Sequence, residues 1–287
     1  MANATPTTPK DQFSSRLEQG MGVAHRKNPG GGAIALFGNT PLEIQNHRKF
    51  VVNDIEFLRS DDVSVTDWTL TGYGGVAETF AVSSDQQDGI AILDVGGATD
   101  NHGAQVQYTA AGGAGEFLNP SQQHIVALEY NTRISRDLEA DWFVGFAETN
   151  ATVLVAATGA LVATLDDYMG FHHLADSETI SLVQGGVAGT DIVVANPSSS
   201  LYVPTNQQSY WHSWGLRVDD NDKMYWYVNG DLVGFTQVGD AETGGTVTGF
   251  AGRSCYTFAV VNNGGASNIT VDYVLSATER SRTDIHA

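Results

Sequence analysis

The stretch WHSWGLRVDDNDKMYWYVNGDLVGF, residues 211–235, decides the fold. Large apolar residues alternate with polar or small ones along both halves of it, at Trp214, Leu216, Val218, Met224, Trp226 and Val228. Alternate residues of a strand share one face, so this pattern predicts two strands with a common apolar face. Asn229-Gly230 predicts a tight hairpin turn after the second strand, because both residues tolerate the positive φ of a type I′ turn.

Similar short runs recur on both sides of this stretch, and we expect each to be a strand: 51–58, 66–71, 89–95, 125–134, 140–146, 167–174, 179–184, 191–195, 255–261 and 269–275. Two of them carry a clear core face. Trp142, Val144 and Phe146 form the first, and Ile269, Val271, Tyr273 and Leu275 are predicted to share the second. Long helical patterns are hard to find, although residues 151–165 fit either a helix or a hairpin through Thr158-Gly159. Period-2 patterning at short spacing indicates an antiparallel sandwich or barrel.

Residues 1–50 differ from the rest of the chain. They hold four of the seven prolines and the run Pro29-Gly30-Gly31-Gly32, with one short helix possible near 11–19. Such a segment cannot build a core of its own, so we expect an extended arm that is ordered only where it lies on another surface. The predicted organisation is a Pro/Gly-rich arm at 1–50 and a β-sandwich domain at 51–287.

Charge divides at the same point. The whole chain has 14 basic and 33 acidic residues and a formal charge of −19. The first 50 residues carry six basic and three acidic side chains, a net +3, which leaves −22 for the rest. An acidic body argues against nucleic acids and anionic membrane surfaces as partners. Cys255 is the single cysteine and no apolar leader is apparent, so we expect a soluble protein made in a reducing cytoplasm.

Four motifs in fixed order carry a family resemblance. They are FVGFAET at 143–149, GFH at 170–172, the W…YVNG pair at 211–230 and VDYV…ER at 271–280. The hairpin and the C-terminus resemble the concanavalin A-like lectin/glucanase superfamily, whose domains are two-sheet jelly rolls. The ordered set, over about residues 60–280, is similar to a group of tailed-phage virion proteins that carry this domain.

The resemblance implies an all-β, two-sheet antiparallel jelly-roll sandwich with an extended N-terminal arm. It also implies a non-enzymatic bacteriophage capsid decoration (cement) protein, made in the host cytoplasm and displayed on the outer capsid surface. Its partners would be the major capsid protein and further copies of itself, as a dimer or trimer. The residues expected to make inter-subunit contacts through the arm are Phe13, Arg16, Leu17, Arg26, Lys27, Arg48 and Lys49.

Two other functions follow from the same superfamily. Its glucanases carry carboxylates in a pattern like E-x-D-x-x-E on one strand, which places acid and nucleophile on one sheet face. The nearest candidate begins with Glu139 and Asp141, but Val144 stands where the third carboxylate belongs. We therefore expect no enzymatic activity and assign no catalytic residue. The alternative function is a glycan-binding module of a head or tail fibre, with Tyr210 and Trp211 as possible glycan contacts.

Three further motifs bear on whether the chain binds a cofactor. Gly72–Ala77 matches G-x-G-x-x-A and Asp94 follows it, but no strand–helix alternation continues, so a glycine-rich turn is preferred to a dinucleotide site. His172-His173 cannot share one metal ion, because adjacent strand residues point to opposite faces. Residues 219–222 (DDND), with Asp166-Asp167, could supply calcium ligands, although a solvated turn is the default interpretation. No cofactor is expected, with Ca²⁺ as the one open possibility.

Overall fold

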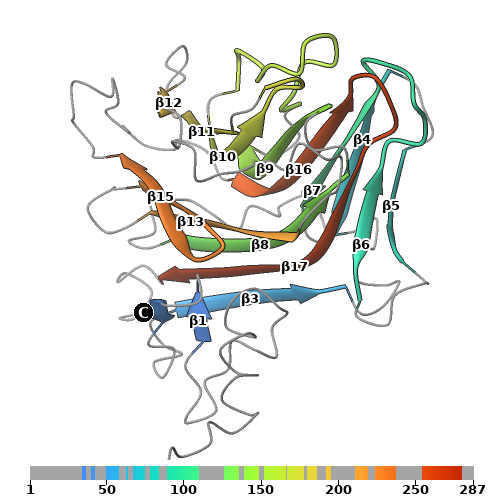
Figure 1. The fold of residues 1–287 in the computed structure, drawn as a ribbon. Helices are drawn as coiled ribbons and strands as arrows, with labels where there is room; N and C mark the ends of the chain where they lie inside the picture. The colour runs from blue at the N-terminus through green and yellow to red at the C-terminus, as the bar shows by residue number, and fades with distance from the viewer. Residues whose placement is uncertain are drawn as a thin grey trace, which may run out of the picture.

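The computed structural model describes residues 34–36, 40–42, 50–57, 63, 67–74, 78–83, 89–109, 126–135, 139–148, 152–165, 167–177, 180–185, 192–194, 211–218, 224–236 and 254–279. In these residues two antiparallel sheets pack face to face (Figure 1). The predicted all-β, two-sheet antiparallel sandwich is confirmed. Within the same residues, no helix is long and apolar enough to cross a membrane.

The two sheets differ in size. The seven-stranded sheet has the order β12 (Ile192–Val194), β11 (Ile180–Gly185), β10 (Tyr168–His173), β9 (Ala140–Glu148), β16 (Ser254–Asn262), β7 (Gly103–Tyr108) and β4 (Trp68–Tyr73). The eight-stranded sheet has the order β15 (Asp231–Thr236), β14 (Met224–Val228), β13 (Trp211–Val218), β8 (Val126–Ile134), β17 (Asn268–Glu279), β6 (Ala91–Asp94) and β5 (Thr79–Val82), and β3 (Phe50–Glu56) also pairs with β17. A separate hairpin joins β1 (Ile34–Leu36) to β2 (Thr40–Leu42).

Every run predicted as a strand contains one. Strands β1, β2, β5 and β7 were not predicted. In β7 the apolar Ala104 and Val106 alternate with Gln105 and Gln107, and all four side chains are buried. A strand that is covered on both faces and carries glutamines on one of them has too few apolar residues to be recognised by hydrophobic alternation.

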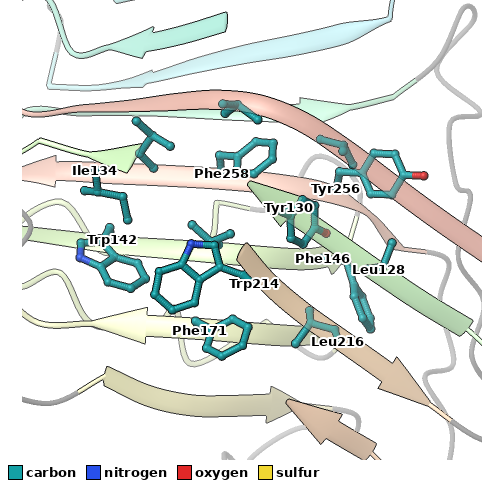
Figure 2. Packing of buried hydrophobic residues seen from close by; sticks show 14 of the residues in the cluster. Leu128, Tyr130, Ile134, Trp142, Phe146, Phe171, Trp214, Leu216, Tyr256 and Phe258 are labelled. Carbon is teal, nitrogen blue, oxygen red and sulfur yellow. The ribbon is translucent and has the colours of Figure 1, made fainter. Parts of the chain in front are cut away.

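Aromatic side chains dominate the core between the sheets (Figure 2). The ring of Trp214 lies 4.8 Å from that of Phe171 and 5.5 Å from that of Trp142. Its Nε1 donates to Thr132 Oγ1 (2.8 Å), and Trp226 Nε1 donates to the carbonyl oxygen of Gly170 (3.1 Å). Both indoles are therefore buried with their N–H groups satisfied, as buried polar atoms require. The core positions predicted for Trp214 and Trp226 are confirmed.

The predicted face of the last strand is wrong in its second half. Ile269 and Val271 point into the core, but a β-bulge between Val271 and Tyr273 shifts the register against β8. A bulge adds one residue to the strand, and a shift of one residue turns the following side chains to the opposite face. Val274 consequently joins the core, while Tyr273 and Leu275 lie on the outside of the sheet.

The turn at Asn229-Gly230 is confirmed, since both residues have positive φ, 52° and 87°. Asn229 Oδ1 also accepts a hydrogen bond from the backbone N–H of Ser213 (3.0 Å), which ties the turn to β13. The predicted helix at 11–19 and the polar tip at 219–222 lie outside the described residues. The domain boundary at residue 50 stays a prediction.

Candidate functional site: the outer face of the seven-stranded sheet

The seven-stranded sheet has one face against the core and one turned away from it, called here the seven-strand outer face. Antiparallel pairing places on this outer face Tyr73, Gln105, Asp141, Phe143, Gly145 and His172. Asp141 and His172, both singled out in the sequence, thus belong to one surface. If the chain had a carbohydrate site built on strand carboxylates, this face is where it would lie.

A segment of the chain itself covers this face. Residues 153–165, the covering hairpin, fold back through a turn at Thr158-Gly159 and are not helical. Val155 N donates to Ala160 O (2.8 Å), Val162 N donates to Val153 O (2.9 Å), and Gly159 has a φ of 64°. In Figure 1 the hairpin is the yellow-green segment above β9 and β10. Of the two structures that the sequence left open for 151–165, the hairpin is therefore the one that forms.

The covering hairpin packs against the sheet through apolar side chains. Its buried side chains Val153, Leu154 and Leu165 form one apolar cluster with Phe143 and Tyr168 of the sheet. This second core lies on the opposite side of the seven-stranded sheet from the main one. Strands β9 and β10 are buried on both faces as a result.

A polar anchor holds the first residue of the hairpin. The Tyr73 hydroxyl donates to Gln105 Oε1, and the same oxygen accepts from the backbone N–H of Val153 (2.9 Å). Burial raises the pKa of the Tyr73 phenol, so the hydroxyl stays protonated and able to donate. Gln105, one of the two glutamines that interrupt the apolar pattern of β7, therefore has a structural role on this face.

A second anchor holds the turn of the hairpin. Gly159 lies directly over the carboxyl group of Asp141: a Cβ at position 159 would come within 1.9 Å of Asp141 Cγ. Asp141 Oδ1 accepts from the backbone N–H of Ala175 (2.6 Å), and His172 Nε2 donates to the carbonyl oxygen of Gly159 (2.9 Å). Asp141 and His172 are each only 7 % exposed. Burial lowers the pKa of His172, which favours the neutral imidazole.

His173 lies on the other face of the same strand. Its ring stacks on Trp142 at 5.5 Å, and its two nitrogens lie 3.0 and 2.8 Å from the carbonyl oxygens of Ala140 and Ser177. The prediction that His172 and His173 point to opposite faces is confirmed. Within the described part of the chain, no group of three or more His, Cys, Asp or Glu side chains is arranged to hold a metal ion.

The outer face of the eight-stranded sheet holds residues that sequence reasoning missed. Glu129 is 4 % exposed, and its Oε1 accepts from the hydroxyls of Ser213 (2.8 Å) and Tyr273 (2.7 Å). The sequence signal that could have identified Glu129 is its position inside the apolar run IVALEYN, where a glutamate is unusual. Trp211, on the same face, is 38 % exposed, with the Arg133 guanidinium 5.2 Å from its ring centre. Its proposed glycan contact stays a prediction, and Tyr210 lies outside the described residues.

The remaining candidates are parts of strands and turns or lie outside the described residues. Gly72 and Tyr73 end strand β4, and the next described element is strand β5, not the helix that a dinucleotide site needs. Asp94 Oδ1 accepts from Gly96 N (2.9 Å) within a turn. Outside the described residues lie Asp166, residues 219–222 and the seven predicted arm contacts Phe13, Arg16, Leu17, Arg26, Lys27, Arg48 and Lys49.

No family model and no curated protein sequence matches the chain. Among solved structures it is similar to the catalytic domain of an endo-1,3-β-glucanase (laminarinase) from Thermotoga petrophila, with 12 % identity, coverage of 81 % of this chain and 99 % of that one, and a TM-score of 0.53. It is also similar to the endo-β-1,3-glucanase of Pyrococcus furiosus, with 14 % identity, coverage of 80 % of this chain and 94 % of that one, and a TM-score of 0.51. The fold is that of the concanavalin A-like lectin and glucanase domains. A further similar structure is the carbohydrate recognition domain of Emp46p, with 12 % identity, coverage of 78 % of this chain and 95 % of that one, and a TM-score of 0.48. At these identities the likeness to concanavalin A-like domains concerns the fold alone.

Proposed function

We propose that this chain is a non-enzymatic structural protein of a bacteriophage virion, a decoration protein that binds the outer capsid shell and neighbouring copies through residues 1–50. The non-enzymatic part is carried by one observation: the covering hairpin occupies the seven-strand outer face. The virion part is supported by the ordered motifs in 143–280 and by the charge difference between the arm and the body.

Glycoside hydrolysis needs two carboxyl groups that flank a bound sugar. Asp141 does not meet this requirement, because Gly159 lies against its carboxyl group and its Oδ1 accepts from Ala175 N. Val144, at the position of the third carboxylate in the glucanase pattern, is fully buried in the main core. The chain therefore has the sandwich fold, but these residues are not accessible to a bound sugar.

The enzymatic alternative is tested with soluble and insoluble β-1,3-glucans. Purified protein and its Glu139→Gln variant should both release no reducing sugar above the buffer blank. Turnover by the wild-type protein that the Glu139→Gln substitution abolishes would contradict the proposal.

The arm is proposed to act through charge and through its extended form. A segment of net +3 is attracted to acidic surfaces such as the −22 bodies of neighbouring copies. Co-sedimentation with phage shells that lack the protein tests this role. The Arg26→Glu/Lys27→Glu variant should lose shell binding, whereas the Lys223→Glu/Arg253→Glu variant, which changes the charge equally in the body, should retain it. Equal binding by the two variants would refute a role for the arm.

One observation favours a second candidate, a glycan-binding module. The exposed indole of Trp211 beside Arg133 is the kind of aromatic surface on which sugar rings stack. A glycan array tests it: a signal that disappears in Trp211→Ala would favour adsorption to a host surface, and an array without signal would favour the structural role.

A further inference from the structure

The face of the eight-stranded sheet that is turned away from the core, the eight-strand outer face, is covered. Five of its side chains point away from the main core and yet are at most 4 % exposed: Ala127, Glu129, Tyr273, Leu275 and Ala277. None of the five belongs to the apolar cluster between the sheets. A sheet face in contact with water would leave these residues accessible, so another part of the protein lies over them.

Strand β1 of the N-terminal arm lies beside β8. Both edges of β8 are already hydrogen-bonded, to β13 and to β17, and its inner face packs into the main core. The remaining lateral approach is over the outer face, so β1 lies on that side, with β2 paired to it. Figure 1 shows β1 below β17, on the side opposite to β9 and β10.

This face has the properties of a docking surface that is formed before its occupant arrives. Leu275 and Ala277 provide an apolar strip along β17, and beside it Glu129 is held by Ser213 and Tyr273. These hydrogen bonds lie within the sheet and do not involve the arm. Glu129 can therefore keep these two donors while one arm leaves and another binds.

We propose that the eight-strand outer face receives the β1–β2 segment of a second copy of this chain, so that neighbouring copies exchange arms. This arm exchange rests on the proposed decoration function, because it identifies the surface through which neighbouring copies would be linked on the shell. The same contacts form whether the arm comes from the same chain or from a neighbour, which makes exchange a low-cost route to association. The short connection at 43–49 favours the chain's own arm in dilute solution, whereas crowding on a shell raises the local concentration of foreign arms.

Photo-crosslinking in the full-length chain tests the exchange. The crosslinking amino acid p-benzoylphenylalanine is placed at Arg133, which lies half-buried on the eight-strand outer face, and as a second variant at Asp272. The matched control carries it at Val155, which is 37 % exposed on the covering hairpin of the other sheet. Isotopically light and heavy chains are mixed in equal amounts over a range of concentrations before irradiation, and the cross-links are mapped by mass spectrometry.

The proposal predicts that cross-links from positions 133 and 272 reach residues 1–49, and that those from 155 do not. The share of cross-links that join a light to a heavy chain should rise with concentration toward one half, the value for free exchange. Cross-links that never reach residues 1–49, or that stay within one isotope at every concentration, would overturn it. Shell co-sedimentation of the same samples separates the two proposals: mixed cross-links without shell binding refute the decoration function alone, and shell binding with unmixed cross-links refutes arm exchange alone.

Discussion

Replacing Gly159 by alanine tests whether the covering hairpin is an integral part of the fold. The residue has a φ of 64°, and an L side chain in this left-handed conformation costs about 1–2 kcal/mol. The new Cβ would also lie 1.9 Å from Asp141 Cγ, and overpacking of this kind costs roughly 1–3 kcal/mol. Together these effects predict a loss of about 2–5 kcal/mol in the free energy of unfolding, measured by urea denaturation with tryptophan fluorescence.

The chain offers a matched control at Gly264. Its φ is 87°, and a Cβ there would meet nothing within 4 Å, so Gly264→Ala carries the backbone cost of about 1–2 kcal/mol without the steric one. Gly159→Ala should therefore be the more destabilising of the two by about 1–3 kcal/mol. Equal effects of the two substitutions would refute the contact between the turn and Asp141.

A double-mutant cycle isolates that contact. Asp141→Ala alone leaves the N–H of Ala175 without its acceptor, which costs about 1–3 kcal/mol. The same change removes the carboxyl group that the new Cβ meets, so the Gly159→Ala/Asp141→Ala double variant should cost less than the sum of the two single variants. Strict additivity would contradict the proposed packing.

Three further predictions concern single side chains. Burial lowers the pKa of His172, so below about pH 6.5 the unfolded chain binds a proton that the folded chain does not. The free energy of unfolding should therefore decrease as the pH falls below this value. The decrease should be less steep in the His172→Gln variant. An unchanged slope would contradict this, although the lowered pKa of His212 leaves some slope in both proteins. Trp226→Phe removes the donor to Gly170 O and leaves a void, so the free energy of unfolding measured in urea should fall by about 2–4 kcal/mol. A decrease below about 1 kcal/mol would contradict the buried hydrogen bond of Trp226. Asn229→Ala should be more destabilising than Asn229→Gly, because the φ of 52° favours glycine, and equal unfolding midpoints would contradict that turn geometry.

The sequence was most informative where side chains alternate against one core. Trp142 and Trp226 are found on the predicted inner faces, and Asn229-Gly230 makes the predicted turn. These features depend on residues next to one another in the strand or the turn, which is why they can be predicted locally. The orientation of Leu275 was not predictable in the same way, because the bulge before Tyr273 follows from pairing with β8 and has no marker within the strand itself.

The candidate site was less predictable. Asp141 and His172 were singled out as isolated residues, but the contact that defines their role comes from Gly159, which approaches only after the covering hairpin folds back. The apolar content of 151–165 fitted a helix and a hairpin equally, and the apolar cluster with Phe143 and Tyr168 distinguishes them only in three dimensions. The hydrogen-bond donors to Glu129, Ser213 and Tyr273, likewise come from strands distant in sequence.

The location of the protein in an assembled particle tests the account most directly. The proposed function predicts that a cryo-electron microscopy reconstruction of the phage particle whose genome encodes this chain shows many symmetry-related sandwiches on the outer shell. From each, density for residues 1–50 should lead to the outer face of β8 and β17 in a neighbouring copy. A particle without this chain, or with a few copies confined to a tail or a single vertex, would contradict the account.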